Sequence, residues 1–269
     1  MKKALAATLL VLACALPARA LEDVPFVVTP DNVTAAMLQL AKVGPDDYLI
    51  DLGSGDGRIV ILAAKRFGAH GLGVEIDPRL VAQSRENARA AGVATRALFR
   101  EQDLFKTDLS PASVVTLYLL PDVNLQLRPR LLALRAGTRI VSHDWDMAEW
   151  QPDKTLTVDA PDKSIGREKT SQLYLWVVPA RVQGDWCGTG KMRGTLLRLA
   201  QEFQRFRGRF EKGDKALDFE GRIDGETLRS PRNVNLHADG DRLRAQAVSK
   251  AYSSVHGGVF TRARTATCK

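Results

Sequence analysis

The sequence predicts an α/β fold, a doubly wound and mostly parallel seven-strand sheet, followed by a small β-rich domain. The first observation is that short apolar runs alternate with helical patterns as far as residue 150, as in parallel sheets covered on both faces. The second is that helical periods become scarce after Pro179, where turn residues separate short strand-like pieces. The chain has 269 residues, 45% of them hydrophobic, which is enough for one large or two modest domains.

The helices of the first domain are delimited by capping and stop signals. Thr29 can cap the first helix, Pro30 suits its first turn, and Gly44 with Pro45 ends it. Pro129 is expected to bend the last helix or to mark a break in it. The expected helices cover residues 29–43, 58–67, 77–91 and 122–137.

The strands of the sheet are expected where apolar runs are short and continuous. Five of them alternate with the helices, and two more follow with no strong helical pattern between them. The last strand is long and is expected to run antiparallel. The seven strands are expected at residues 48–51, 71–76, 95–101, 113–120, 138–145, 154–160 and 171–180.

The first twenty residues are typical of an export signal. A basic start precedes the apolar residues 4–16, which are too short to span a bilayer, and Ala18-Arg19-Ala20 is a small-x-small cleavage site. An uncleaved anchor, a buried N-terminal helix and a lipoprotein modified at Cys14 are the alternatives. The signal predicts an exported protein, periplasmic in a bacterium, with no membrane span in its mature form.

The second domain is expected to be a β meander of about 85–90 residues. The stretch 192–213 fits neither helical nor strand periodicity cleanly, and we interpret it as two strands joined by a turn near residue 204. The expected organisation is a signal peptide at 1–20, the α/β domain at 21–179 and the β domain at 180–269.

The mature chain would keep two cysteines, Cys187 and Cys268, which suggests a disulfide in an oxidising compartment. The loop that they close is long enough for about 4–5 kcal/mol in the chain-entropy model. Two unpaired thiols are the alternative.

The net charge of the whole sequence is +8, and the basic excess is concentrated late in the chain. Because the late arginines alternate with core-type residues, we interpret them as a solvated surface and expect no specific nucleic-acid partner. Affinity for nucleic acid, anionic lipid or acidic envelope polymers is the alternative.

The most informative stretch is DLGSGDGRIV, residues 51–60, which follows a buried strand. A dinucleotide fingerprint would require a third glycine at position 58, where the chain has Arg58, and the third glycine comes early as Gly57. No Gly-Lys-Ser/Thr follows, so the phosphate-binding P-loop is excluded as well. Gly53 and Gly55 allow a sharp turn and a close approach of the backbone to a ligand.

Acidic residues surround this loop. Asp51 and Asp56 place negative charge where a pyrophosphate would have to bind, which favours a ligand with a cationic portion. The helix expected to start near Asp56 would direct free N–H groups at the ligand, although Asp56 can also be only its N-cap. Glu75, after the second strand, can accept hydrogen bonds from two ribose hydroxyls. Asp103, after the third strand, can accept one from an exocyclic amino group or cap the next turn.

These motifs, DLGSGDGRIV, GVEIDPRLVAQSREN and EQDLF in this order, resemble a class I seven-strand methyltransferase that uses S-adenosylmethionine (SAM). The resemblance covers residues 24–178 and implies a Rossmann-like sheet with an antiparallel hairpin. Within that family VPFVVTP and LGSGDGRIV resemble the protein-lysine methyltransferases of the mitochondrial ATP-synthase and nucleotide-translocase type. They resemble even more closely a group of exported bacterial proteins of unassigned substrate.

The resemblance implies a role for each motif. Glu75 would hold the ribose of SAM, and Asp103 with the backbone of Leu104 would hold the adenine. Tyr118 to Asn124 falls where the strand-four motif of the family faces the methyl group. The residues implied for the methionine end of SAM are Asp51, Gly53, Ser54, Gly55 and Gly57.

The methyl acceptor is left open by the sequence. The strand-four segment lacks the Asn-Pro-Pro-Tyr pattern of base and amide methylases, and Asp122 and Asn124 are candidates for positioning the acceptor. His143 is either a general base or a satisfied loop histidine. The stretch 144–150 can clamp a cationic lysine side chain, unless its two tryptophans are simply buried. With four histidines and no Cys/His cluster, we expect no metal site.

The expected location conflicts with the expected cofactor, because SAM is made in the cytoplasm. The sequence therefore leaves two alternatives to an exported methyltransferase with an unassigned acceptor, for which a protein lysine amine is a candidate. One is a catalytically silent SAM-binding or envelope scaffold module. The other is an enzyme whose signal is inefficient and which acts inside the cell. The oligomeric state is not indicated by the sequence.

Overall fold

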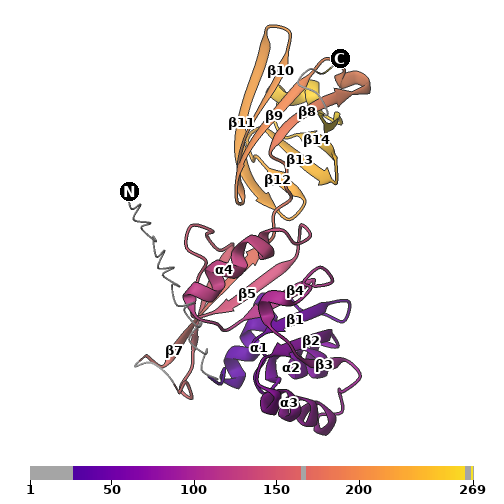
Figure 1. Ribbon diagram of the computed structural model, residues 1–269. Coiled ribbons are helices and arrows are strands. Elements are labelled where there is room, and N and C mark those ends of the chain that lie inside the picture. Colours follow the sequence, from indigo (N-terminus) through magenta and orange to yellow (C-terminus); the bar gives the residue numbers. More distant parts are fainter. Residues whose placement is uncertain (1–26, 165–167, 264–267, 269) are drawn as a thin grey trace, which may run out of the picture.

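The protein folds as an α/β sheet domain and a β-barrel that follow one another along the chain (Figure 1). The structure is a computed structural model that describes residues 27–164, 168–263 and 268. The expected signal peptide at 1–20 lies outside the described residues. Within the described ranges, no helix is long and apolar enough to cross a bilayer.

The first domain contains a seven-strand sheet in the order β3-β2-β1-β4-β5-β7-β6. Strands β1 to β5 are parallel, and β7 runs antiparallel to both β5 and β6. The doubly wound sheet with a terminal antiparallel hairpin is therefore confirmed. Its strands are β1 (Tyr48–Leu52), β2 (His70–Glu75), β3 (Ala97–Glu101), β4 (Val114–Leu117), β5 (Arg139–His143), β6 (Lys154–Asp159) and β7 (Thr170–Val177).

Helices cover both faces of this sheet, as its apolar strands require. Three helices and one face of the sheet form one buried apolar cluster, whereas α4 packs with Trp150 and Trp176 on the other face. The helices are α1 (Asp31–Leu40), α2 (Arg58–Phe67), α3 (Pro78–Ala90) and α4 (Pro121–Leu132), with a 3-10 turn, η1, at Leu104–Lys106.

Several expected boundaries differ from the structure, among them the end of α4, which is Leu132 and not residue 137. The residue that precedes α1 is Pro30, because the hydroxyl of Thr29 lies 3.4 Å from Nδ1 of the buried His143 and does not cap the helix. Strand β4 ends at Leu117, and α4 begins directly at Pro121, a favoured first position for proline. Helix α4 also continues through Pro129 without a break.

The second domain is a closed antiparallel barrel of eight strands, each paired with its neighbour along the chain, and the first pairs with the last. The β-rich meander is confirmed, including the hairpin across residues 192–213. The structure also closes this meander into a barrel, which the sequence did not predict. The strands are β8 (Gly184–Thr189), β9 (Leu196–Glu202), β10 (Arg205–Lys212), β11 (Lys215–Asp224), β12 (Thr227–Arg229), β13 (Val234–Asp239), β14 (Arg242–Ala247) and β15 (Val259–Arg262), with 3-10 turns η2 (Gly190–Met192) and η3 (Lys250–Val255).

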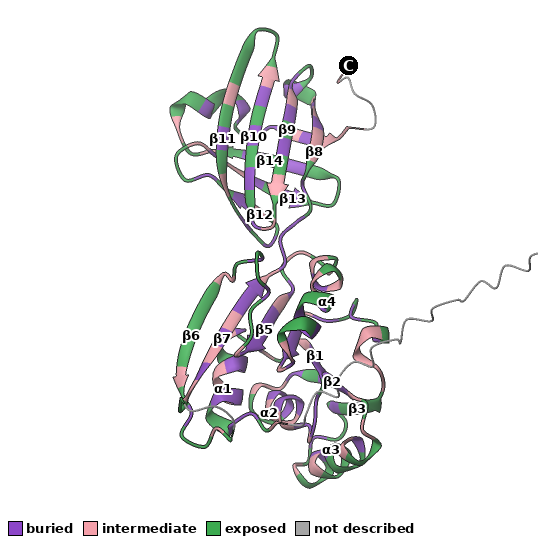
Figure 2. Cartoon of the chain, turned by 60° about the vertical axis from the view of Figure 1, so that its left-hand side comes forward, coloured by how far each residue is buried: buried purple, intermediate pink, exposed green. Residues whose placement is uncertain are grey.

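The barrel has its own apolar core. Buried and exposed residues alternate along its strands, as period-2 side chains of a half-buried sheet do (Figure 2). The buried side chains include Trp186, Phe210 and Phe260. Cys187 in β8 is bonded to Cys268, so the expected disulfide is present in the structure, with the two Cα atoms 5.2 Å apart.

The turn between β9 and β10 connects the barrel to the sheet domain. Phe203 in this turn has a φ of +49° and its ring lies 6.4 Å from that of Trp150. Next to it, the amide of Gln204 donates to Asp153, 3.1 Å away, and Arg222 forms an ion pair with the same carboxylate at 2.5 Å. The contact therefore combines an aromatic pair with a shared carboxylate.

Candidate active site

A cavity of about 530 Å³ opens at the carboxyl ends of the parallel strands. The chain order reverses between β1 and β4, and ligands of open α/β sheets bind beside such a reversal. The cavity is lined by the glycine loop after β1, the loops after β2, β3 and β4, and the segment before α1. Its lining includes Val27, Val28, Thr29, Asp51, Gly53, Ser54, Gly55, Asp56, Arg58, Glu75, Ile76, Asp103, Leu104, Phe105 and Tyr118.

The glycine loop is tightly built, and its three glycines differ in role. Gly53, Gly55 and Gly57 all have positive φ values, which residues with a Cβ seldom adopt. Gly57 is the residue before α2, and a Cβ there would lie 2.6 Å from the ring of Phe99. Gly57 is not among the residues lining the cavity. Its position therefore matches close helix–strand packing, whereas Gly53, Ser54 and Gly55 line the cavity.

Asp51 is the most deeply buried acid of the cavity, 2% exposed. Its carboxylate accepts a 2.7 Å hydrogen bond from the hydroxyl of Thr116 in β4. Burial, together with the nearby charges of Glu75 and Asp56, raises the pKa of Asp51 to about 7, although the hydrogen bond from Thr116 opposes the rise. A cationic group in the cavity would oppose this effect, because it stabilises the charged carboxylate.

Glu75 joins two loops of the site. Its Oε2 accepts from the backbone N–H of Gly55 at 3.0 Å, and its Oε1 accepts from Ile76 and Asp77 at 2.8 and 3.1 Å. The sequence prediction placed this carboxylate on a ribose, and the structure places it in the cavity wall. It also holds the glycine loop, a role that its spacing in the sequence did not reveal.

Asp103 and Leu104 line the cavity after β3. The carboxylate of Asp103 accepts from the N–H of Phe105 at 2.8 Å and so caps the turn η1. The two alternatives for Asp103 are therefore compatible, because Oδ1 caps the turn while the residue still faces the cavity. Ile76, 66% exposed, adds an apolar surface beside these two residues.

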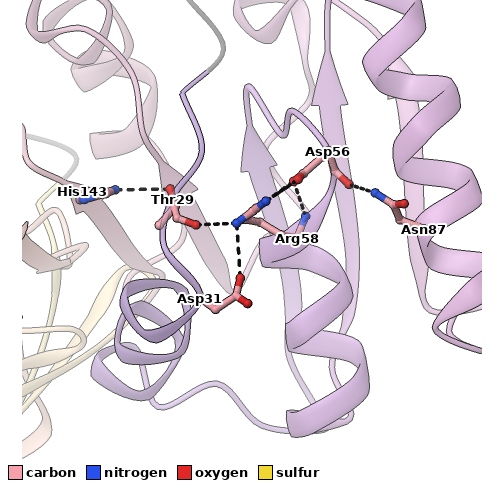
Figure 3. A network of polar contacts seen from close by, with 6 residues as sticks. All are labelled: Thr29, Asp31, Asp56, Arg58, Asn87 and His143. Carbon is pink, nitrogen blue, oxygen red and sulfur yellow. Dashed lines mark hydrogen bonds and ion pairs between the residues drawn. The ribbon is translucent and has the colours of Figure 1, made fainter. Parts of the chain in front are cut away.

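Arg58 is the residue that sequence reasoning missed in this loop. Its guanidinium contacts both oxygens of Asp56 and donates to the carbonyl of Thr29 and to Asp31 (Figure 3). The negative charge of Asp56 is therefore paired within the protein, and Asp51 is left as the acid of the glycine loop without an ion pair to arginine or lysine among the described residues. The helix begins at Arg58, the first residue of its expected range 58–67.

Tyr118 and His143 form a stacked pair behind the cavity. Their ring centroids lie 3.9 Å apart. His143 is fully buried, with Nε2 2.8 Å from the hydroxyl of Ser171, and burial lowers its pKa to about 4. Among the residues that line the cavity, Tyr118 is present and His143 is absent. The placement matches a satisfied structural histidine more closely than a general base.

The two acceptor candidates on α4 lie outside the cavity lining. Asp122 is exposed in the first turn of α4. Asn124 is buried, and its amide lies 3.1 Å from the hydroxyl of Ser142 and 3.3 Å from the carbonyl of Trp145. Asn124 therefore supports the loop after β5, and any effect on an acceptor would act through that loop.

The loop after β5 contains the acidic and aromatic residues noted in the sequence. Trp150 is fully buried, as the second interpretation of this stretch expected, whereas Trp145 is 42% exposed, so that the lysine clamp stays a prediction for Trp145. The carboxylate of Asp144 lies 3.5 Å from the hydroxyl of Tyr118 and 2.8 Å from the ammonium of Lys163. Nothing in the local sequence around Lys163 indicated this ion pair.

The cavity fits SAM in several respects. Acidic side chains face it, the buried hydroxyl of Ser54 has no hydrogen-bond partner among the described residues, and glycines let the backbone approach a ligand closely. SAM carries a sulfonium and an ammonium, which these acids would favour over a pyrophosphate. Within the ranges that the structure describes, no group of three or more His, Cys, Asp or Glu side chains has metal-ligand geometry.

The sheet topology and this cavity define a class I SAM-dependent methyltransferase. A family profile described as the ANTKMT methyltransferase domain matches residues 51–154. The chain is 43% identical over 157 residues to a protein-lysine N-methyltransferase of Saccharolobus islandicus, covering 58% of this chain and 94% of that protein. The protein belongs to this protein-lysine methyltransferase family.

Two further similarities show the extent of the relationship. The chain is 37% identical over 132 residues to the adenine nucleotide translocase lysine N-methyltransferase of Mus musculus, covering 48% of this chain and 57% of that relative. A crystal structure of an RNA methyltransferase from Salinibacter ruber with S-adenosyl-L-homocysteine is 50% identical, with a TM-score of 0.54. The match covers 59% of this chain and 98% of that one.

Proposed function

We propose that the protein methylates lysine amines of a protein partner outside the cytoplasm, with SAM as methyl donor. The observation that carries this proposal is the junction of two features at Tyr118. This residue lines the acidic cofactor cavity, and its hydroxyl reaches the acidic and aromatic loop after β5. A donor site next to a site for a cation is the arrangement that lysine methylation requires.

Each wall of the cavity has a proposed role. Asp51, with Gly53, Ser54 and Gly55, would bind the cationic methionine end of SAM. Glu75 would accept from the ribose hydroxyls with the lone pairs that its three backbone contacts leave, and Asp103 would accept from the adenine amino group. The exposed Ile76 and the side chain of Leu104 offer apolar surfaces to the flat adenine ring.

Methyl transfer needs a neutral amine that is in line with the sulfonium methyl group. SAM supplies that methyl, so that a nitrogen–carbon bond forms while the carbon–sulfur bond breaks and S-adenosylhomocysteine leaves. The task of the protein is then to orient the acceptor, exclude water and accept a proton from the lysine ammonium. Burial and the charge of Asp144 raise the pKa of Tyr118 to about 12, so Tyr118 remains a hydrogen-bond donor at neutral pH.

Export to the periplasm is part of the proposal. It rests on the N-terminal sequence, and the bond between Cys187 and Cys268 supports it, because structural disulfides are rare in reducing compartments. Fusion of residues 1–25 to an export reporter tests this point. Retention of the reporter in the cytoplasm would contradict it, and labelling of free thiols in the unfolded, unreduced protein would contradict the disulfide.

Calorimetry with SAM tests the donor site on the purified protein. Glu75→Gln should weaken SAM binding by about 1–2 kcal/mol, because the amide keeps one acceptor and loses the charge. Glu86→Gln changes an exposed acid on α3 and should leave the affinity unchanged. Equal affinities for the two variants would refute the ribose assignment, and no binding at all would favour the silent scaffold.

An RNA acceptor is the second candidate, because the Salinibacter ruber neighbour is described as an RNA methyltransferase. The basic barrel provides a surface that RNA would favour. Methyl transfer from radiolabelled SAM into envelope protein, cytoplasmic protein and RNA fractions separates the candidates. Label that is removed by protease supports lysine methylation, and label that is removed by ribonuclease supports the alternative.

A further inference from the structure

Asp144 lies at the carboxyl end of β5 in a backbone conformation that aspartate seldom adopts. Its φ is +62°, and such strain persists only where the surroundings impose it. The backbone N–H of Asp144 donates to the carbonyl of Gln172 at 2.7 Å, and Oδ1 accepts from the N–H of Gln172 at 3.0 Å. Strand β7 therefore fixes the backbone and one carboxylate oxygen, which leaves Oδ2 for side chains.

Oδ2 of Asp144 is linked to the cofactor cavity through the hydroxyl of Tyr118. It is 3.5 Å from the hydroxyl of Tyr118, whose side chain lines that cavity. It is also 3.5 Å from Nε2 of His143, which the hydroxyl of Ser171 already engages at 2.8 Å. A cation bound to this oxygen would be next to the methyl-donor side of the site.

The cation at this oxygen is a lysine of the same chain. Nζ of Lys163 lies 2.8 Å from Oδ2 of Asp144 and donates to the carbonyl of Thr170 at 2.8 Å. Its side chain is 13% exposed, although lysine ammonium groups normally stay in water. Lys163 therefore presents to Asp144 the same chemical group that an acceptor lysine would present.

We propose that Asp144 is the anchor for the acceptor ammonium, and that Lys163 occupies this anchor until a substrate lysine displaces it. The inference rests on the proposed lysine methylation and names the residue that selects a lysine. Lys163 acts as an internal competitor in this scheme.

The surroundings of the anchor suit an incoming lysine chain. Trp145 and Asp146 are exposed beside it. Tyr174 in β7 pairs with Ser142 in β5, two residues before Asp144. Burial raises the pKa of Tyr174, and the charges of Asp146 and Asp144 add to the rise. Aromatic faces attract ammonium and methylammonium groups, so the same rim can hold a lysine before and after methylation.

An internal competitor lowers the apparent affinity for the substrate. The apparent dissociation constant is the intrinsic one divided by the fraction of molecules in which the anchor is free. Removing the ammonium of Lys163 should therefore lower KM for the acceptor without changing kcat. Removing the charge of Asp144 should raise KM, because a charge-assisted hydrogen bond is lost.

The test uses the full-length mature protein, radiolabelled SAM and poly-L-lysine as the acceptor. Lys163→Gln should lower KM for poly-L-lysine about threefold to tenfold, and Asp144→Asn should raise it tenfold or more. Lys154→Gln and Asp162→Asn are the matched controls, since both residues are exposed, lie in or next to β6 and undergo the same charge changes. Both controls should keep the wild-type KM, and calorimetry should give the same SAM affinity for all five proteins.

Equal KM values for Lys163→Gln and Lys154→Gln would overturn the internal competition, and an unchanged KM in Asp144→Asn would overturn the anchor. In both cases the proposed methylation would stand, because transfer would still occur. Absence of SAM binding, or absence of transfer to poly-L-lysine by every variant, would overturn the proposed function together with the inference. Thermal unfolding of each variant shows whether a loss reflects folding, and Lys163→Met then serves as a second test of the competitor.

Discussion

The sheet domain and the barrel differ in charge and in the features that they bury. Residues 21–179 hold 18 basic and 21 acidic residues, whereas residues 180–269 hold 18 basic and 10 acidic residues. The sheet domain keeps a buried carboxylate, an ion pair close to its cavity and, among the described residues, three non-glycine residues with positive φ, against one in the barrel. The barrel closes its strands on an apolar core and adds a disulfide. The difference separates a domain arranged for chemistry from one arranged for stability and surface charge.

The largest expected effect follows from removal of the disulfide. Replacing Cys187 and Cys268 with serine should lower the free energy of unfolding of the barrel by about 2–5 kcal/mol, because the unfolded chain regains the freedom of an 81-residue loop. Denaturant unfolding followed by barrel and sheet tryptophans measures this effect. SAM affinity should not change, and a parallel loss of SAM binding would show that the two domains do not behave separately.

The buried acid of the glycine loop should make the sheet domain sensitive to pH. Asp51 has a raised pKa of about 7 when folded, so folding is disfavoured as pH rises from the unfolded value near 4 through 7. The penalty reaches up to about 4 kcal/mol above pH 7 and vanishes below pH 4. Asp51→Asn should therefore unfold at higher denaturant than wild type at pH 8.

The control for this effect is the barrel transition, which should not respond to Asp51→Asn at either pH. The same variant should bind SAM more weakly than wild type at pH 8, because it lacks the negative charge. A wild-type stability that rises between pH 5 and pH 8 in the sheet domain would contradict the assignment.

Two glycines with positive φ, one in each domain, test the comparison between the sheet domain and the barrel. Gly57→Ala should cost about 2–4 kcal/mol, because a Cβ would meet Phe99 and Ser84 in addition to the backbone strain. Gly240→Ala in the barrel should cost only about 1 kcal/mol, since nothing lies within 4 Å of the added atom. Paired unfolding curves measure the difference. Equal losses would show that strain alone, without packing, governs both turns.

The smallest expected effect concerns the contact between the barrel and the sheet domain, where Arg222 pairs with Asp153. Arg222→Ala should cost about 0.5–1 kcal/mol, because Arg222 is half-exposed and only its partner Asp153 is largely buried. The midpoints of the two unfolding transitions should move closer to those of separate domains. Arg229→Ala, a half-exposed barrel arginine paired with Asp224, is the matched control and should leave the sheet transition unchanged.

Much of the architecture was predictable because periodicity and turn residues are local signals. The loop of DLGSGDGRIV, Glu75 and Asp103 follow three successive strands, and parallel strands bring their carboxyl ends to one edge. These residues therefore line one cavity as expected. Closure of the barrel was not predictable, because the pairing of β8 with β15 joins segments more than 70 residues apart.

The acceptor side of the site was harder to predict, because it depends on contacts between distant segments. Asp122 and Asn124 were chosen for their place after the fourth strand, but helix geometry turns Asp122 to solvent and Asn124 into the core. The contact of Asp144 with Lys163 spans β6, and that of Arg58 with Thr29 spans α1 and β1. No local spacing encodes such contacts.

The packed interior of the barrel limits which of its surfaces another molecule could contact. Gly208 and Gly221 face side chains or backbone so closely that even a methyl group at either position would clash. A molecule that binds the barrel would therefore contact its outward side chains and not its lumen. Outward arginines such as Arg205 and Arg207 are exposed to solvent, and counter-ions screen their attraction within about 8–10 Å. Encounters with this face would then be governed by ionic strength, much as an anion exchanger retains or releases its load.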